Sequence, residues 1–224
     1  LQTREQHIRR GQATSNICTA QALLAIISAA YAIYHGPRGI LKIANRTSKL
    51  AKLFSEGVKA TGFNILSDHF FDTVTVKTKD KTKEIYQKAL AKKINLRNVN
   101  NEMISVAFDE AKKLEDVNTL LEIFGSNKKY DQEVKVELNN IPSQLKRTSK
   151  YLTHPVFNKY QSETEMLRYL KKLEDCDIAL NRSMIALGSC TMKLNATAEL
   201  IPITWKEFSL PHPFVPVEQM KGYQ

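Results

Sequence analysis

Apolar residues recur at helical spacing through the first sixty residues of the chain. Ile17 to Tyr34 carries no charge, and it is followed by His35-Gly36-Pro37, where glycine can end a helix and proline cannot continue one. A second stripe then recurs every three or four residues, with Gly62 just beyond its end. Its members are Ile40, Ile43, Ala44, Thr47, Leu50, Ala51, Phe54 and Val58. The pattern predicts two long helices that meet at Gly36-Pro37.

The middle of the chain changes to shorter elements of mixed type. Phe70, Val74 and Val76 share one side of a period-two run that ends at Lys77, which is typical of a strand. A helix is expected next at 82–93, followed by strands at 94–99 and 103–108 with an asparagine-rich turn at 98–101 between them. A last helix is expected from Asp116 to Gly125, with Asp116 as its N-cap and Gly125 as its C-cap. An antiparallel sheet with helices on one face would bury all these stripes together, so residues 1–125 are predicted to form a small α+β domain.

The chain becomes polar and loses its period between residues 126 and 150, which predicts a connection packed in part through Val134, Val136 and Leu138. Residues 151–224 form a third section. In it, Ser162 and Glu165 have the spacing of a capping box and predict the start of a helix. The inner face of that helix would carry Met166, Leu167, Leu170 and Leu173.

The uncharged stretch from Ile17 to Tyr34 could be mistaken for a membrane span. Thr19, Gln21 and Ser28 interrupt it, and its length is at the lower limit for a hydrocarbon core of about 30 Å. We therefore expect a helix that is buried on most sides in a protein without a membrane association.

A net charge of +10 raises the alternative of a basic module that binds nucleic acid or serves as a scaffold. The lysines are spread along predicted helices, however, so solvated helix faces are favoured and no nucleic acid is expected. They are Lys42, Lys49, Lys52 and Lys59 on one helix, and Lys81, Lys83, Lys88, Lys92 and Lys93 on another. A salt titration separates the two hypotheses, because phosphate binding weakens steeply as salt rises.

Metal and disulfide sites have little support in the sequence. Cys18, Cys176 and Cys190 lie far apart, which favours a reducing compartment. The histidines are isolated, and Asp68-His69-Phe70-Phe71-Asp72 is at most a weak trio of ligands, so no metal is expected. His154-Pro155 and His212-Pro213 are expected to form extended turns.

A run of small residues from Gly188 to Asn195 is the strongest candidate site. Gly188 permits unusual backbone angles, and Ser189, Cys190, Thr191 and Asn195 bring compact donors together, as an anion or carbonyl site requires. A turn that caps a helix beginning near Asn195 would have the same composition. Cys190 as a nucleophile, with His154 or His212 as its base, is a less favoured alternative.

The same region carries a family resemblance. Three segments resemble, in their order along the chain, the glycine cleavage system P-protein family. They are Gly188-Ser-Cys-Thr-Met-Lys-Leu-Asn195, Ile201-Pro-Ile-Thr-Trp205 and His212-Pro-Phe-Val-Pro216. The resemblance to this family extends to four further segments, at residues 1–10, 13–22, 154–158 and 162–168. The resemblance implies a duplicated fold-type-I pyridoxal-phosphate enzyme of roughly four times this length, of which the chain is an internal fragment. Residues 1–125 would end the first half, 126–150 would connect the halves, and 151–224 would be the N-terminal arm of the catalytic half.

The resemblance also implies an activity, a cofactor and partners. The complete enzyme would use pyridoxal 5'-phosphate to release carbon dioxide from glycine and transfer the aminomethyl group to the lipoyl arm of H-protein. It would act as a homodimer or two-subunit assembly, in the cytoplasm of a bacterium or the mitochondrial matrix of a eukaryote. Ser189, Cys190 and Thr191 would shape the wall beside cofactor and glycine, with Lys193 and Asn195 as further contributors.

The cofactor lysine of that family follows a histidine, and the sequence contains no His-Lys pair. The fragment alone is therefore expected to be inactive. Trp205, Phe208 and Phe214 are expected to be exposed when their partner domain is missing.

Overall fold

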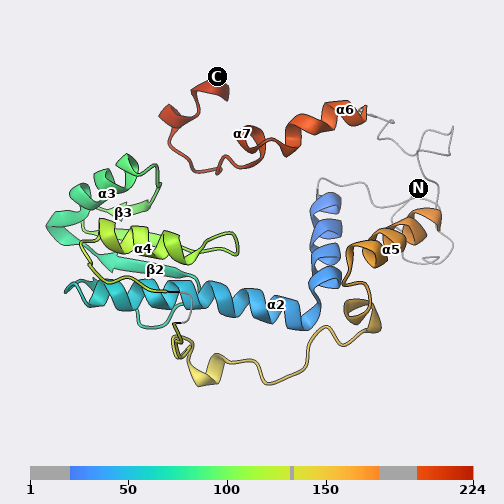
Figure 1. Ribbon diagram of the computed structural model, residues 1–224, viewed down its shortest axis with the longest axis horizontal. Helices are drawn as coiled ribbons and strands as arrows, with labels where there is room; N and C mark the ends of the chain where they lie inside the picture. Colours follow the sequence, from blue (N-terminus) through green and yellow to red (C-terminus); the bar gives the residue numbers. More distant parts are fainter. Residues whose placement is uncertain (1–20, 132–133, 177–195, 224) are drawn as a thin grey trace. The chain divides into compact units, whose positions relative to one another are not determined.

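The computed structural model describes residues 21–131, 134–176 and 196–223 (Figure 1). Residues 35–153 form one compact unit, and the described residues before and after them form a second. The described elements are helices together with one small antiparallel sheet, which confirms the predicted mixture of helix and strand.

Helix α2, Gln21–Lys59, is the longest described element and consists of two segments. Gly36 lies between them with a φ of 59° and a ψ of −179°, a conformation that is essentially restricted to glycine. Pro37 follows and has no N–H to donate to the helical ladder. The predicted break is thus confirmed, as is the end of the second segment before Gly62, whose φ is 89°.

The sheet has the strand order β1-β2-β4-β3 and is antiparallel throughout. Its strands are β1 (Asn64–Ile65), β2 (Thr73–Lys77), β3 (Arg97–Asn100) and β4 (Met103–Ala107). Val74 pairs with Val106, and Val76 with Ile104, so four buried side chains share one face. The opposite face carries a hydrogen bond of 3.1 Å from the Thr75 hydroxyl to Ser105 Oγ.

Several strand limits differ from the prediction, and the strand expected from Ile94 begins only at Arg97. The strand expected from Phe70 starts at Thr73, because the Phe70 N–H instead donates to the Asn140 carbonyl at 3.2 Å. Strand β3 extends to Asn100, whose side chain accepts the Glu102 N–H at 2.9 Å and forms the turn to β4. The predicted turn at 98–101 therefore began too early.

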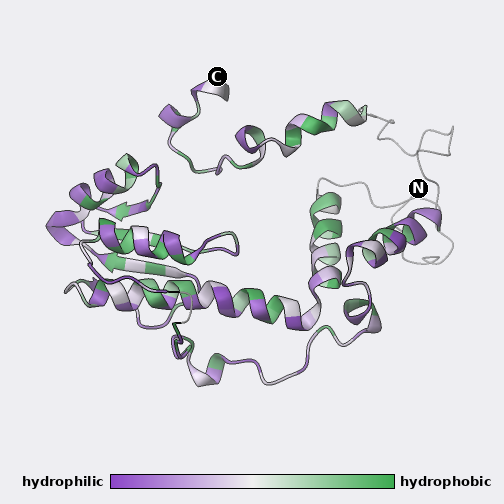
Figure 2. Cartoon of the chain, in the orientation of Figure 1, coloured by the Kyte–Doolittle hydropathy of each residue, from purple (hydrophilic) through white to green (hydrophobic). Residues whose placement is uncertain are grey.

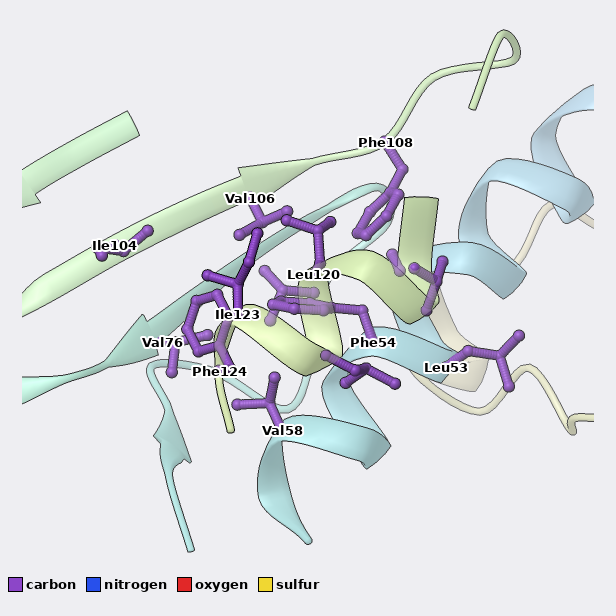
Figure 3. Packing of buried hydrophobic residues seen from close by; sticks show 14 of the residues in the cluster. Leu53, Phe54, Val58, Val76, Ile104, Val106, Phe108, Leu120, Ile123 and Phe124 are labelled. Carbon is purple, nitrogen blue, oxygen red and sulfur yellow. The ribbon is translucent and has the colours of Figure 1, made fainter. Parts of the chain in front are cut away.

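The core of the 35–153 unit joins three helices to the buried face of the sheet. Figure 3 shows part of this core, with Phe54 among buried side chains of the sheet and of the chain around 120–124. Helices α3 (Thr82–Ala91) and α4 (Leu114–Ile123) pack there with the second segment of α2. The centre is the Phe54 ring, whose centroid lies 5.3 Å from that of Phe124 and 5.7 Å from that of Phe108. Because these side chains belong to one cluster, the prediction of helices on one face of the sheet is confirmed.

Gly57 lets α2 approach α4 closely. A Cβ atom at this position would lie 2.4 Å from Cδ2 of Leu121, a side chain with no exposed surface. We expect Gly57→Ala to lower the free energy of unfolding by roughly 1 kcal/mol, because an overpacking cost of about 1–3 kcal/mol exceeds the helix-propensity gain of about 1 kcal/mol. Urea unfolding measures this, and a stabilised variant would contradict the close packing.

The start of α4 corrects the predicted N-cap. The helix begins at Leu114 with Lys113 as N-cap, and the Asp116 carboxylate accepts the Lys113 N–H at 2.7 Å. Asp116 thus accepts the backbone N–H of the N-cap residue from its own position in the first turn of the helix. The C-cap is Phe124 instead of the predicted Gly125, which follows it with a φ of 81°, so the helix ends one residue earlier than predicted.

The connection after α4 is attached to the core by its own side chains and by Asn118 of α4. Val134 and Val136 pack against the core cluster as predicted, whereas Leu138, predicted with them, is half-buried outside that cluster. Asn118 exchanges two hydrogen bonds of 2.9 Å with the backbone of Tyr130. Asn140, which is 1% exposed, donates from Nδ2 to Ser48 Oγ at 2.9 Å and to the Phe70 carbonyl at 2.8 Å.

The second unit contains α5 (Glu163–Asp175), α6 (Thr197–Leu200) and α7 (Lys206–Ser209). Ser162 begins α5 as predicted, since its Oγ accepts the Glu165 N–H at 3.4 Å. The Glu165 carboxylate accepts from the Ser162 hydroxyl at 3.0 Å, in place of the Ser162 N–H of a standard capping box.

Two predictions of burial in the second unit are wrong for the described residues. The expected inner face of α5 is exposed, with Leu167 at 59% and Leu173 at 48%. The first segment of α2 was expected to be buried on most sides, yet Leu24 is 66% exposed. Within the first segment of α2, Ile33 is buried at 9%, so the exposure is greatest in its first turns. Among the described helices, none is both long and apolar enough to cross a membrane.

Candidate functional site

The five predicted site residues lie outside the residues that the structure describes. They are Ser189, Cys190, Thr191, Lys193 and Asn195. The chain is described again from Ala196, whose N–H donates to the Glu199 carboxylate at 2.8 Å, and α6 begins at the next residue. A helix start near Asn195 is therefore confirmed, while the roles of the five residues stay predictions.

The described residues contain a hollow of about 710 Å³ between the second segment of α2 and the start of α4. Its lining residues are Arg46, Lys49, Leu50, Leu53, Lys113, Leu114, Glu115 and Asp116. The Arg46 guanidinium donates to the carbonyls of Glu110 and Lys112, and Lys49 Nζ donates to the Val134 carbonyl. These two cations thus hold the chain before α4 and the connection after it against α2. Lys49, predicted on an outward face, is half-buried by this contact.

The lining of this hollow does not fit pyridoxal phosphate. The cofactor needs a lysine that can form a covalent bond, donors for its phosphate and a surface for its ring. Lys49 Nζ and Arg46 already bind backbone carbonyls, and the lining includes two carboxylates, Glu115 and Asp116, which would repel a phosphate. The eight lining residues include no aromatic ring. We therefore assign this hollow a structural role.

The two His-Pro sequences have local structural roles. His154 is extended, with a φ of −62° and a ψ of 140°, and its Nδ1 accepts the Val156 N–H at 3.2 Å. The predicted extended turn is confirmed there. In the same way, His212 Nδ1 accepts the Phe214 N–H at 3.0 Å.

The weak ligand trio at Asp68 to Asp72 is engaged in other contacts. Lys59 Nζ donates to Asp68 Oδ1 at 2.5 Å, and this hydrogen bond and charge lower the pKa of the Asp68 carboxyl. Asp72 accepts from the Thr73 hydroxyl at 2.8 Å. In the described parts of the chain, no three His, Cys, Asp or Glu side chains are grouped as a metal ion would require.

Several of the lysines considered for nucleic-acid binding are paired with carboxylates. Within α3, Lys88 Nζ lies 2.6 Å from Glu84 Oε1. Lys92 Nζ lies 2.9 Å from Glu122 Oε2, and this ion pair joins the end of α3 to α4. Hydrogen bonds from these lysines lower the pKa of Glu84 and of Glu122. Lys52 pairs with Glu56 at 3.6 Å. Such pairing reduces the free positive charge that a phosphate backbone would meet.

Comparison with known proteins identifies the family. The family model for the glycine cleavage system P-protein matches residues 1–124, more than half of the chain. The chain belongs to this family. The P-protein resemblance in the sequence motifs is thereby confirmed.

Curated relatives extend the P-protein match to the full 224 residues. Three proteins named glycine dehydrogenase (decarboxylating) align with all of the chain. They come from Pelagibacter ubique at 66% identity, Photobacterium profundum at 54% and Paraburkholderia xenovorans at 51%. The chain spans 24% of each relative's length.

Proposed function

We propose that these 224 residues belong to a protein that decarboxylates glycine in the glycine cleavage system. The complete protein would release carbon dioxide and transfer the aminomethyl group to the lipoyl arm of H-protein. The observation that carries this proposal is the alignment of the whole chain, at 51% to 66% identity, with three proteins named for that reaction.

Pyridoxal 5'-phosphate would supply the electron sink for the reaction in the complete protein. The hollow between α2 and α4 does not fit it, and no lysine in the sequence follows a histidine as the cofactor lysine of the family does. We place the covalent anchor in the remaining polypeptide. The duplicated fold-type-I architecture and the assignment of 1–125, 126–150 and 151–224 to its parts belong to the same proposal, as does assembly into a homodimer or two-subunit enzyme.

Within that enzyme, the 35–153 unit would act as a self-contained support. It has its own core, and its connection is bound through Lys49 and Asn140. The loop from Gly188 to Asn195 would contribute the positional contacts beside cofactor and glycine. Ser189, Cys190 and Thr191 would form its wall, with Lys193 and Asn195 next to them.

A hybrid protein tests the proposed function. These 224 residues replace the matching quarter of the Pelagibacter ubique relative, and glycine-dependent release of carbon dioxide is measured with pyridoxal phosphate and lipoylated H-protein. The intact relative is the positive control, and the 224-residue chain alone is the negative one. We expect activity from the hybrid and none from the chain alone. A folded hybrid that lacks activity while the intact relative works would contradict the proposal.

Cys190→Ser in the hybrid separates a positional role from nucleophilic catalysis. A wall residue that keeps its size and a hydrogen-bonding group should lower kcat/KM by less than about tenfold. Loss of a covalent nucleophile lowers the rate by a factor on the order of 10⁴ or more. Steady-state measurement of kcat/KM decides between the two roles. A decrease on the order of 10⁴ would show that Cys190 acts as a nucleophile.

A further inference from the structure

The chain passes twice between the 35–153 unit and the second unit, at residues 34–35 and at 153–154. A hydrogen bond joins the chain next to these two passages. The Tyr151 hydroxyl donates to the Pro37 carbonyl at 2.6 Å, across 114 residues of sequence. Both residues belong to the 35–153 unit, so the contact holds the ends of both passages together on that unit.

The break of α2 at Gly36 does not fix its own direction. Pro37 disfavours the helical conformation at the residue before it, so the helix must break at Gly36. Glycine, however, adopts extended conformations with positive and with negative φ at similar cost, and the two turn the chain in different directions. The observed φ of 59° is one of these alternatives. A contact beyond Gly36 is therefore needed to select it, and the Tyr151 hydroxyl binds the next residue.

The direction of this break matters because the two segments of α2 differ in their surfaces. Figure 2 shows hydrophobic colouring along most of the first segment, whereas hydrophobic and hydrophilic residues alternate along the second. Leu50, Phe54 and Val58 of the second segment lie in the core of the 35–153 unit. The conformation of Gly36 thus decides which way the hydrophobic segment leaves that core.

Tyr151 is itself held in place. Its side chain is half-buried, and the Arg147 guanidinium carbon lies 5.5 Å from its ring centroid, within the range of a cation–π contact. The next residue, Leu152, has a φ of 48°, in the left-handed region that residues with a side chain seldom adopt. Such a conformation persists only where the surrounding structure fixes it. The turn from Tyr151 to Leu152 therefore defines the direction of the second passage.

The connection between α4 and Tyr151 has other anchors on α2. Lys49 binds the Val134 carbonyl, and Asn140 binds Ser48. These anchors lie in the second segment of α2, away from the break, and they hold the connection without Tyr151. Loss of the Tyr151 hydroxyl should therefore leave the core intact and affect mainly the two passages.

We propose that Tyr151 is a positioning residue whose hydrogen bond to Pro37 fixes the direction in which both passages leave the 35–153 unit. The second passage leads to the loop from Gly188 to Asn195, the candidate wall beside cofactor and glycine. Tyr151 acts on the reaction through the placement of that loop, without contact to cofactor or glycine. The effect on the reaction rests on the proposed function, whereas the fixed direction does not.

Tyr151→Phe in the hybrid protein tests the proposal, because it removes only the hydroxyl and keeps the ring beside Arg147. Tyr130→Phe is the matched control, since the Tyr130 hydroxyl is buried without a hydrogen-bond partner among the described residues. Spin labels are attached at Lys83→Cys in the 35–153 unit and at Lys172→Cys on α5, both exposed positions, in a hybrid whose native cysteines are changed to serine. Pulsed electron spin resonance then gives the distribution of the distance between the labels. Steady-state assays of the hybrid with its native cysteines give kcat/KM for glycine.

Tyr151→Phe should widen the distribution of this distance at least about twofold, because more than one conformation of Gly36 becomes populated. It should also lower kcat/KM for glycine by about ten- to a hundredfold, since a misplacement of about 1 Å can cost a factor of about a hundred. Tyr130→Phe should change neither quantity.

An unchanged distance distribution in Tyr151→Phe would overturn the proposal. Equal widening in Tyr130→Phe would also overturn it, in favour of a general loss of packing. A widened distribution with an unchanged kcat/KM would show that the loop does not depend on the contact, and would overturn the positioning role. An unsubstituted hybrid without activity would contradict the proposed function alone, and widening in Tyr151→Phe would then still support the fixed direction.

Discussion

Phe54→Ala is expected to lower the free energy of unfolding of the 35–153 unit by about 3–5 kcal/mol. The Phe54 side chain has no exposed surface and contacts both Phe108 and Phe124, so alanine leaves a cavity between α2, α4 and the end of β4. Domains of this kind are stable by only about 5–15 kcal/mol, and the melting temperature should fall by roughly 10–25 °C. Thermal and urea unfolding followed by circular dichroism measure the loss.

Phe71→Ala is the matched control for this substitution. Phe71 is 45% exposed and lies outside the core cluster. Its removal should change the free energy of unfolding by less than about 1 kcal/mol. If both variants lost the same stability, the core would not be centred on Phe54.

Asn140→Ala is expected to lower the free energy of unfolding by about 2–4 kcal/mol. The Asn140 amide is buried and binds Ser48 on α2 and the Phe70 carbonyl before β2, so alanine leaves one buried and one partly buried group without their donor. Each such loss costs about 1–3 kcal/mol. Because Asn140 lies in the connection, the segment around Val134 and Val136 should also become more accessible, which limited proteolysis measures.

Asn139→Ala provides the comparison at the neighbouring exposed position. It should leave both the unfolding free energy and the proteolysis rate close to those of the unsubstituted chain. An Asn140→Ala variant that behaved like Asn139→Ala would show that the connection is not held by this side chain.

The elements with a strong period could be predicted from the sequence. The break in α2, the alternation of Val74 and Val76, and the end of α4 shortly before Gly125 each follow from local geometry, and the structure confirms them. The two-residue strand β1 is too short to show a period. Arg46, Lys49 and Asn140 were not recognised as anchors, because their partners lie 64 to 92 residues away and leave no local pattern.

The predictions of burial failed for a different physical reason. A hydrophobic face on α5 or on the first segment of α2 indicates that the face needs a partner, but it does not indicate which polypeptide supplies that partner. Leu24 and Leu167 therefore belong to correctly predicted helices and are exposed in this chain. Trp205, Phe208 and Phe214 are exposed at 51%, 55% and 90%, as the sequence predicted.

The candidate site was predicted from its small hydrogen-bonding residues and from its family motif. The residues from Gly188 to Asn195 have neither a helical nor a strand period, so no physical pattern assigns them a shape, and they lie outside the described residues. The family membership rests on the same motifs and on the match over residues 1–124. The chemical roles of the residues from Gly188 to Asn195 are tested by the hybrid protein experiments.

Mapping the cofactor lysine tests the central claim most directly. The 224-residue chain and the hybrid are incubated with pyridoxal phosphate, reduced with borohydride and digested, and the modified lysine is located by mass spectrometry. We predict stoichiometric modification of a single lysine in the hybrid, outside these 224 residues, and no stoichiometric modification of the chain alone. Stoichiometric attachment at one lysine within residues 1–224, lost when that lysine is replaced, would contradict the account.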